Sequence, residues 1–347
     1  MSRPRPGRRA PAEQSSAITL DMVAREAGVS PSTVSRILNG TARVRESKVR
    51  DVEAAIAKFR FSPNPVARSL ARGRSMSVGV VTQALASPYY GTALAAIEKR
   101  LLRAGYAALF VSGHGREEDE RKCVEHLLSR RVEGIILLTS GRSDAELSHL
   151  SGTVPLVVTG RSVAGERLCC LDVDSTSGAR LAVEYLLGLG HRRIAMIAGA
   201  AGRADAAQRL AGYRAALAAA KVPYDRKLVV PGQYTERGGY AAMDALLTSG
   251  ASFTAVFAAN DQSAVGALLA LHRHGRRVPR DVSVVGYDDL PSSAYTIPPL
   301  TTIHRSTEEV GEMAAEAIID LVEGRPVRTH VPAPTLAVRE SARPLRS

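Results

Sequence analysis

The sequence has little cysteine and no long apolar segment. Its three cysteines, Cys123, Cys169 and Cys170, form neither a disulfide framework nor the spacing of metal ligands. The N-terminus is rich in arginine and proline with no apolar stretch behind it, so we predict no signal peptide. No segment approaches the length needed to cross a membrane. These absences predict a soluble, cytoplasmic protein without structural disulfides, metal or membrane partner.

Motifs that mark phosphate-binding or catalytic sites are also missing. No Gly-x-Gly-x-x-Gly follows a predicted strand, and no Gly-x-x-x-x-Gly-Lys-Ser/Thr is present. We find no nucleophile–base pair and no metal-ligating cluster. His191, His272 and His274 have no partner at ligand spacing, and we expect them to be solvated or capping residues. The sequence therefore predicts a binding protein that is not an enzyme and needs no cofactor.

The net charge of +12 is concentrated at the N-terminus. Residues 1–76 hold 15 lysines and arginines against six aspartates and glutamates, and so carry +9 of that charge. Such a distribution is expected when a polyanion-binding domain is joined to a near-neutral one. The length of 347 residues and the hydrophobic content of 45% favour two or three domains with large cores.

Residues 18–40 predict two short helices joined by a tight turn. The apolar positions of the first helix recur on one face: Leu20, Val23, Ala24 and Ala27. Gly28 has the backbone freedom to end that helix, Ser30 suits an N-cap, and Pro31 suits the first position of the second helix. Polar and small groups remain for the outward face of the second helix: Pro31, Ser32, Ser35, Arg36 and Asn39. This pattern is typical of a helix-turn-helix that enters the major groove of DNA, although a packing module of three helices would also show it.

A third helix is expected over residues 46–60, and an unusual linker follows it. Residues 66–71 allow a helix of under two turns, which is not stable by itself in water. Leu70 lies between Arg68 and Arg72, which is odd for a plain tether. We predict a hinge that folds only against DNA, with the leucine as an apolar wedge at a base step and the arginines on phosphates.

From residue 77 the pattern changes to alternating strands and helices. Nine apolar segments are predicted as strands: 78–82, 107–112, 134–139, 155–159, 168–173, 194–198, 228–231, 255–258 and 282–286. Amphipathic helices separate most of them: 91–104, 117–131, 176–188, 209–220, 238–248 and 262–274. Strands separated by single helices form parallel sheets through right-handed crossovers. This many strands favours two doubly wound subdomains over a single sheet.

Ordered motifs over residues 18–340 resemble the LacI/GalR family of bacterial repressors. The N-terminal matches are Ala-Gly-Val-Ser-x-Ser-Thr-Val-Ser-Arg-x-Leu-Asn-Gly and the hinge Asn-Pro-x-Ala-Arg-Ser-Leu. Matches in the remainder include Ser87-Pro-Tyr-Tyr90, Arg209-Leu-Ala-Gly-Tyr213, Phe257-Ala-Ala-Asn-Asp261 and Asp281-Val-Ser-Val-Val-Gly-Tyr-Asp-Asp289. The resemblance implies an all-α helix-turn-helix headpiece with a hinge helix. It also implies a periplasmic-binding-protein-like core, type I, with two doubly wound parallel-sheet subdomains.

The resemblance implies a division of the chain and a mode of assembly. The expected segments are a disordered basic lead-in (1–17), a helix-turn-helix DNA-binding domain (18–62), a hinge helix and linker (63–76), a ligand-binding core (77–340) and a tail (341–347). Within the core, an N-subdomain would take about 77–174 and 304–334, and a C-subdomain about 175–303 and 335–340. The chain is expected to bind a near-palindromic operator in double-stranded DNA as a homodimer, in the cytoplasm and associated with the nucleoid. No leucine heptads follow Ser341, so a tail-mediated tetramer is not expected.

Site residues follow from the same resemblance. Base contacts are expected from Pro31, Ser32 and Arg36, of which Arg36 suits the O6 and N7 atoms of guanine. Phosphate contacts are expected from Thr19, Ser30, Thr33, Ser35 and Asn39. Leu70, with Arg68, corresponds to the minor-groove hinge. The expected ligand residues are Tyr89, Tyr90, Asp205, Arg209, Tyr234, Asn260, Asp288 and Arg305. Arg305 stands where the family frequently has glutamine, which favours an acidic or phosphorylated ligand.

The chemistry of these ligand residues suits a sugar. An arginine with carboxylates and an amide binds hydroxyl groups, and tyrosine faces cover the apolar side of a ring. We therefore expect a ligand-responsive repressor of carbohydrate-utilisation genes, or alternatively a regulator that responds to a nucleobase or a sugar phosphate. Solvated charges, turns and helix caps would explain the same residues structurally. A solute-binding transport protein would have a signal peptide and no headpiece, and an α/β enzyme would need a catalytic cluster.

Overall fold

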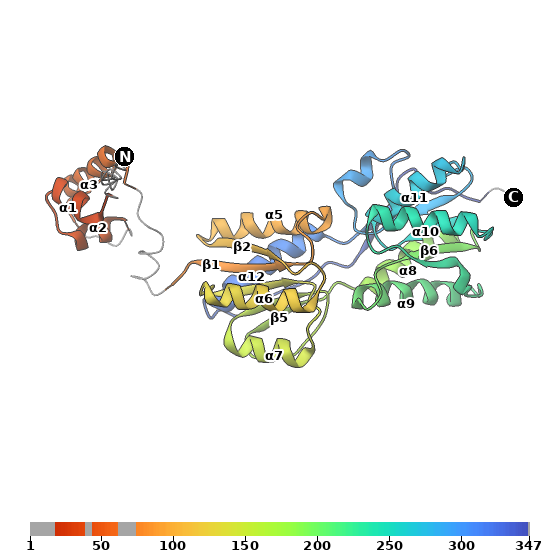
Figure 1. The fold of residues 1–347 in the computed structure, drawn as a ribbon, viewed down its shortest axis with the longest axis horizontal. Helices are drawn as coiled ribbons and strands as arrows, with labels where there is room; N and C mark the ends of the chain where they lie inside the picture. Colours follow the sequence, from red (N-terminus) through yellow and green to blue (C-terminus); the bar gives the residue numbers. More distant parts are fainter. Residues whose placement is uncertain (1–17, 39–43, 62–73, 346–347) are drawn as a thin grey trace, which may run out of the picture. The chain divides into compact units, whose positions relative to one another are not determined.

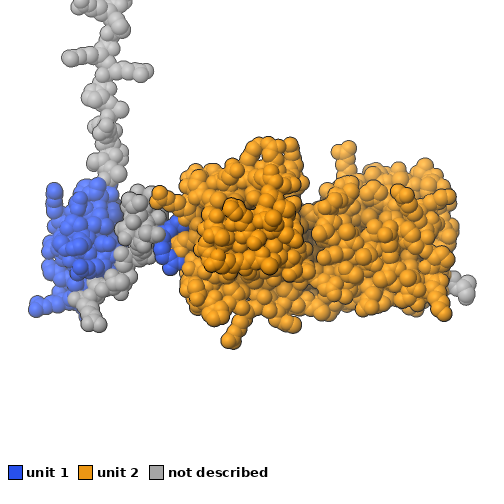
Figure 2. Space-filling view, turned by 90° about the horizontal axis from the view of Figure 1, so that it is seen from below, with its two compact units in different colours: residues 1–75 blue, residues 76–347 orange. Residues whose placement is uncertain are grey.

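The computed structural model describes residues 18–38, 44–61 and 74–345, and the chain divides into two compact units. Unit 1 is residues 1–75 and unit 2 is residues 76–347, coloured separately in Figure 2. Several predictions fall outside the described residues: the lead-in 1–17, the phosphate contact Asn39, and the hinge residues Arg68 and Leu70.

Unit 1 is built from three short helices. They are α1 (Leu20–Glu26), α2 (Pro31–Leu38) and α3 (Glu46–Phe59). Gly28 has a φ of +59° in the turn between α1 and α2, and Ser30 Oγ accepts a hydrogen bond from the backbone of Thr33 at 3.2 Å. The predicted turn and N-cap are therefore confirmed. One apolar cluster holds the helices together: Val23, Ala24, Ala27, Val34, Val52 and Ala55.

The first half of unit 2 is a five-stranded parallel sheet in the order β2-β1-β3-β4-β5. Its strands are β1 (Ser77–Thr82), β2 (Ala107–Ser112), β3 (Gly134–Leu138), β4 (Leu156–Thr159) and β5 (Leu168–Leu171). Helices α5 (Pro88–Arg103) and α12 (Thr307–Val322) pack on one face, and α6 (Glu117–Ser129) and α7 (Asp144–Thr153) on the other (Figure 1). Every residue of β1, β3 and β4 is buried because helices cover both faces.

The second half of unit 2 repeats this architecture with four parallel strands in the order β7-β6-β8-β9. The strands are β6 (Ile194–Ala198), β7 (Val229–Pro231), β8 (Ala255–Ala258) and β9 (Ser283–Val285). Helices α8 (Ser175–Gly188) and α9 (Ala204–Ala219) cover one face, and α10 (Glu236–Thr248) and α11 (Asp261–Arg273) cover the other. Short 3₁₀ helices occur at Arg226–Leu228 and Pro291–Tyr295.

A short antiparallel pair lies where the chain passes between the halves. Strand β10 (Thr302–His304) pairs with β11 (Thr335–Ala337), and α12 between them packs on the first sheet. Beyond β11, Ser341 is buried, donates its hydroxyl to the carbonyl of Val284 at 2.6 Å, and accepts from the backbone of Thr301 at 2.8 Å. The second half is thus completed by residues from the C-terminal end of the described chain.

The nine predicted strands correspond to β1–β9, with ends that agree within two residues. Three features differ from the prediction. The antiparallel pairing of β10 with β11 was not predicted, and α9 begins at Ala204 rather than at Arg209. The expectation that His191 is solvated or capping is wrong, because its ring is 2% exposed and lies 2.9 Å from Thr254 Oγ1 and 3.1 Å from the carbonyl of Arg343. The pairing of β10 with β11 and the burial of His191 both depend on contacts between segments far apart in the sequence.

Candidate functional site

One face of α2 in unit 1 is available to a partner. Val34 is fully buried in the core of the unit, which fixes the opposite side of the helix outward. Ser32 and Arg36 are exposed on that outward side, and Pro31 is exposed at the first position of the helix, which agrees with the exposure that base-reading residues need. The helix therefore presents two small groups and one arginine, a set that fits the width of a DNA major groove.

Three of the predicted phosphate contacts in the described part of unit 1 lie at or near the start of a helix, namely Thr19, Ser30 and Thr33. Thr19 is exposed and caps α1, accepting from the backbone of Met22 at 3.4 Å. Ser30 is exposed, and its hydroxyl lies 2.8 Å from that of Ser32 and 2.9 Å from that of Thr33. Ser35 is half-buried on α2. Hydroxyl groups and backbone N–H groups at helix starts are suited to phosphate oxygens.

Unit 2 contains a pocket of about 600 Å³ between its two halves, which appear as separate lobes in Figure 2. All eight predicted ligand residues line it: Tyr89, Tyr90, Asp205, Arg209, Tyr234, Asn260, Asp288 and Arg305. The volume is of the size expected for a small-molecule site. The structure thus brings together side chains that are as far as 216 positions apart in the sequence.

The sheet architecture explains this convergence. Tyr89 and Tyr90 lie at the start of α5 after β1, and Asp205 lies at the start of α9 after β6. Asn260 follows β8, and Asp288 follows β9. In parallel sheets the carboxyl ends of the strands meet at one edge, where ligands of open α/β folds bind. Arg305 joins them from the segment after β10.

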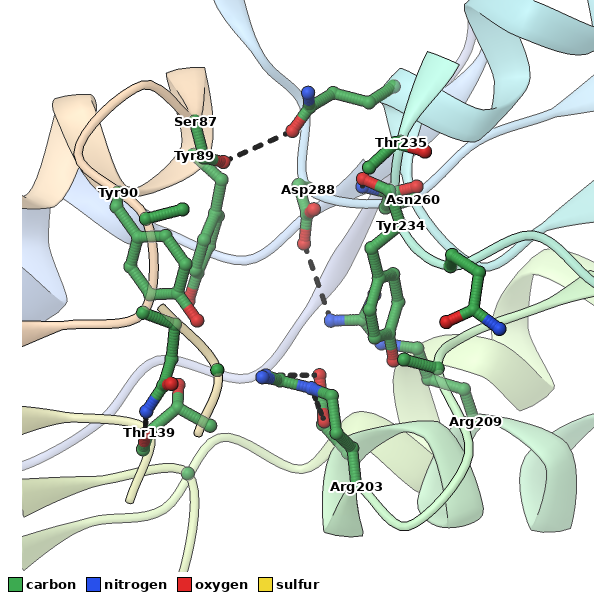
Figure 3. Close-up of a pocket in the computed structure, with 18 of the residues that line it drawn as sticks. Ser87, Tyr89, Tyr90, Thr139, Arg203, Arg209, Tyr234, Thr235, Asn260 and Asp288 are labelled. Atoms are coloured by element: carbon green, nitrogen blue, oxygen red, sulfur yellow. Dashed lines mark hydrogen bonds and ion pairs between the residues drawn. The ribbon is translucent and has the colours of Figure 1, made fainter. Parts of the chain in front are cut away.

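The first half forms a neutral wall of the pocket. The rings of Tyr89 and Tyr90 meet edge to face, with centroids 5.0 Å apart (Figure 3). Gln83, His114 and Thr159 line the same side, and none of them had been predicted. Burial raises the pKa of Tyr89 to about 12, so its hydroxyl stays protonated at neutral pH. This wall offers ring faces, hydroxyl and amide groups and one imidazole, and no carboxylate or guanidinium among the lining residues of the first half.

The second half forms a charged wall centred on Arg209. This side chain is 2% exposed, donates to the carbonyl of Ala259, and lies 3.4 Å from Oδ1 of Asp288. Its guanidinium carbon lies 3.9 Å from the ring centroid of Tyr287 and 5.3 Å from that of Tyr234. Stacked rings and one carboxylate thus hold the guanidinium in place.

Arg203 completes this wall, and sequence reasoning missed it. Its Nε and one terminal nitrogen lie 3.0 and 3.4 Å from the two carboxylate oxygens of Asp205 (Figure 3). Burial alone would raise the pKa of Asp205, but Arg209 and Arg203 outweigh it, so the pKa falls below its usual value. The signal available in the sequence was position: Arg203 immediately precedes α9, two residues before Asp205.

Asp288 has the opposite shift. Burial raises its pKa above the usual range, and the charges of Arg209 and Arg305 only partly oppose this effect. It is 6% exposed and adopts a φ of +109°. Such a conformation is uncommon outside glycine, so the neighbouring strands hold this carboxylate in a strained position between the two arginines.

Asn260 and Asp261 act at the start of α11. The Asn260 side chain accepts from the backbone of Ser263 at 3.0 Å and donates to the carbonyl of Tyr234 at 3.0 Å, so part of its hydrogen-bonding capacity serves as a cap. Asp261 lies behind the pocket and accepts three hydrogen bonds: from Leu290 N, Ser293 Oγ and Thr302 Oγ1. Burial, followed by the charge of Asp288, raises the pKa of Asp261 to about 7.

Two further findings concern the described part of the chain as a whole. No helix in residues 18–38, 44–61 and 74–345 is long and apolar enough to cross a membrane. Those same residues contain no group of three or more His, Cys, Asp and Glu side chains placed to hold a metal ion.

A helix-turn-helix unit combined with a two-lobed pocket domain is the organisation of a ligand-responsive transcriptional regulator. Residues 19–64 match the lacI family of bacterial regulatory proteins, and residues 183–342 match a periplasmic binding protein-like domain. The transcriptional regulator CelR of Thermobifida fusca is 38% identical over 338 residues, which cover 93% of this chain and 98% of CelR. The chain therefore belongs to the LacI family.

Two solved structures are similar to this one over nearly the full chain. The complex of CelR with cellobiose superimposes with a TM-score of 0.70 and 35% identity, covering 94% of this chain and 100% of that one. The lac repressor dimer bound to operator and the anti-inducer ONPF has a TM-score of 0.84 and 31% identity, covering 94% and 99%. The fold predicted from the sequence is confirmed.

Proposed function

We propose that this regulator represses carbohydrate-utilisation genes, that it binds a near-palindromic operator as a homodimer, and that a sugar in the pocket of unit 2 changes its affinity for DNA. It acts by binding, not by catalysis, and it acts on the bacterial nucleoid in the cytoplasm. The observation that carries the proposal is the exposed face of α2, where Pro31, Ser32 and Arg36 project from a packed helix-turn-helix.

The DNA contacts divide into two classes. Arg36 donates two hydrogen bonds to guanine, while Pro31 and Ser32 contact neighbouring base edges. Hydroxyls and an amide bind phosphates and set the register: Thr19, Ser30, Thr33, Ser35 and Asn39. Residues 63–76 form the hinge, in which Leu70 inserts at the central base step and Arg68 binds the backbone.

The pocket supports a sugar as effector. Arg209, Asn260 and Asp288 provide donors and acceptors on one wall, and Tyr89 and Tyr90 provide ring faces on the other (Figure 3). The cellobiose bound by the related CelR is a sugar. Since the pocket lies between the two halves, a ligand that contacts both changes the balance between arrangements of the halves, and thereby the affinity for operator.

An exposed apolar site on unit 2 supports a dimer. Tyr295, the last residue of the 3₁₀ helix Pro291–Tyr295, is 86% exposed, and Ile297 two residues later is 94% exposed. Large apolar side chains this exposed mark contact surfaces in soluble proteins. The related lac repressor structure is a dimer. Two headpieces brought together in this way would read the two half-sites of a palindrome.

The DNA-binding part of the proposal is tested with an operator selected from random duplexes by the full-length protein. Arg36→Ala should weaken binding to the selected operator by about 1–3 kcal/mol and relax the preference at one base position. Arg180→Ala, at an exposed position of α8, serves as the matched control and should bind normally. Selection of no common sequence would contradict sequence-specific binding.

The effector part is tested by thermal denaturation of the full chain against a panel of sugars. A ligand at 100 times its dissociation constant adds about 2.7 kcal/mol to the stability of the folded state, and this should raise the melting temperature by a few degrees. The stabilising sugar should also change operator affinity in a mobility-shift assay. A sugar that stabilises the protein without changing operator affinity would contradict the proposed switch.

A further inference from the structure

Arg305 lines the pocket but has no hydrogen-bond acceptor among the residues that the structure describes. Its side chain is 7% exposed, and its Nε is buried without a partner. Asp288 is the carboxylate paired with Arg305. Its Oδ1 lies 3.6 Å from a terminal nitrogen of Arg305, which is beyond hydrogen-bonding distance. The ring of Tyr89 lies 5.2 Å from the guanidinium carbon. None of the N–H donors of this buried cation is therefore hydrogen-bonded to a residue that the structure describes.

The carboxylate beside Arg305 is shared. The same oxygen of Asp288 lies 3.4 Å from Arg209, so two buried guanidinium groups depend on one carboxylate oxygen. Arg209 has additional partners, namely the carbonyl of Ala259 and the ring of Tyr287, whereas Arg305 has only the ring of Tyr89. The deficit of negative charge thus falls on Arg305.

The other carboxylates of the region do not restore the balance. Asp205 is occupied by Arg203 in a two-point ion pair. Asp261 contacts neither buried arginine and is held by donors behind the pocket. Asp172 is exposed to solvent and forms no ion pair with Arg305 within 4.0 Å. Among the residues that line the pocket, three arginines stand against two aspartates.

A buried unpaired charge is unfavourable, and most side chains relieve it by losing the charge. Arginine cannot, because its guanidinium stays protonated in proteins. The remaining way to satisfy Arg305 is an anion supplied by the ligand. A planar guanidinium presents two parallel N–H groups that match the oxygens of a carboxylate or a phosphate.

We infer that the effector is a sugar bearing an anionic group, a carboxylate or a phosphate, and that Arg305 binds this group. The inference rests on the proposed function of the same pocket as an effector site. The hydroxyls of the sugar are then bound by Asn260 and by the paired Arg203 and Asp205, while the ring of Tyr89 keeps its contact with the guanidinium of Arg305.

The first test uses inorganic phosphate as the probe and does not require the effector. Phosphate is titrated into the full-length protein against chloride at constant ionic strength, and binding is followed by calorimetry. Arg305→Gln removes the charge at similar size, and should weaken the pocket's phosphate affinity by about tenfold or more. Arg305→Lys keeps a cation and should retain part of the affinity, which also shows that position 305 tolerates substitution.

Arg180→Gln is the matched control, since Arg180 is exposed and lies outside the pocket. Its phosphate affinity should equal that of the wild type. Phosphate that binds to the basic N-terminal unit contributes equally to the signal of every variant, so a difference between variants reports binding in the pocket. Equal phosphate binding by wild type and Arg305→Gln would overturn the inference.

The second test distinguishes a phosphate from a carboxylate as the bound anionic group. It also distinguishes a failure of the anion inference from a failure of the proposed effector function. A sugar, its sugar acid and its phosphate ester are compared as matched sets for binding and for their effect on operator affinity. The charged member should bind about tenfold tighter than the neutral parent, and Arg305→Gln should remove that preference. Tighter binding of the ester identifies a phosphate, and tighter binding of the acid identifies a carboxylate.

The outcomes of this test are distinguishable. If neutral sugars bind as tightly as charged ones and still change operator affinity, the inference fails and the proposed function stands. If Arg305 binds phosphate but operator affinity responds to no member of the sets, the anion site stands and the effector function fails.

Discussion

The two halves of unit 2 share one architecture but present different chemistry to the pocket between them. The first half contributes tyrosine rings and uncharged groups such as Gln83 and Thr159. The second half contributes charged groups held by one another, among them Arg203, Arg209 and Asp288. Both sets lie at the carboxyl ends of parallel strands, so the difference comes from side chains and not from the backbone.

This difference assigns separate tasks to the walls. Ring faces bind many sugars because the contact is apolar and lacks strict direction. Buried charges bind only groups that match them, because an unmatched partner leaves a desolvated charge unpaired. We therefore expect the charged groups of the second half, together with Arg305 from the segment between β10 and α12, to select the effector, and the tyrosine rings and polar groups of the first half to add contact area.

The largest effect should come from the carboxylate that the two buried arginines share. Asp288→Asn keeps the size of the side chain, and asparagine tolerates positive φ, but the change leaves Arg209 and Arg305 without a counter-charge. Chemical denaturation should show a loss of about 3–5 kcal/mol in the free energy of unfolding. Tyr89→Phe, on the opposite wall, should lose less than about 0.5 kcal/mol. Equal losses of unfolding free energy in the two variants would contradict the proposed difference between the walls.

The next effect is a pH dependence in the second half. The pKa of Asp261 is raised from 3.8 to about 7 in the folded protein, so the folded state binds more protons than the unfolded state between these values. Stability should therefore fall as the pH rises through this window, by roughly 4 kcal/mol at most. Asp261→Asn cannot ionise and should flatten the curve of melting temperature between pH 4 and pH 8. Parallel curves for the two proteins would rule out Asp261 as the titrating group.

A smaller effect concerns how the helices pack. A Cβ on Gly239 of α10 would overlap the backbone of Ser263 on α11, whereas a Cβ on Gly152 of α7 meets nothing within 4 Å. Gly239→Ala should destabilise the second half by about 2 kcal/mol, because two helix backbones must separate. Gly152→Ala in the first half should stabilise by about 0.5–1 kcal/mol through helix propensity. A stabilising Gly239→Ala would show that this close approach is not required.

The smallest effect should come from the hydrogen bond that joins the walls. Ser87 at the start of α5 donates to Gln262 of α11 at 3.1 Å (Figure 3). Ser87→Ala should cost about 0.5–1 kcal/mol, since Gln262 keeps its contact with Glu236 and water can replace the hydroxyl. Ser129→Ala removes a bond within one helix and serves as the control. A loss above about 2 kcal/mol for Ser87→Ala would mean that this bond, and not the charged wall, dominates the contact between the halves.

Much of the fold followed from short patterns in the sequence. Continuous apolar runs located β1–β9, because strands covered on both faces need no polar residues. Gly28 and Pro31 located the turn and the start of α2. Such patterns depend only on a few neighbouring residues, so they are recognisable without knowing how the remainder of the chain folds. They do not predict the pairing of β10 with β11, which joins residues 31 to 35 positions apart at the register Thr302–Ala337 and His304–Thr335.

The candidate site likewise combines features that the sequence indicates with features that only the folded structure shows. The sequence by itself determined which side chains are available, and its family resemblance pointed to eight residues that line one pocket. Only the tertiary structure decided their partners: Arg203 with Asp205, Arg209 and Arg305 with a single oxygen of Asp288, and Asp261 with three donors behind it. The reason is physical. The charge state and the available hydrogen bonds of a buried group depend on what surrounds it, and these surroundings come from segments that meet only when both sheets have formed.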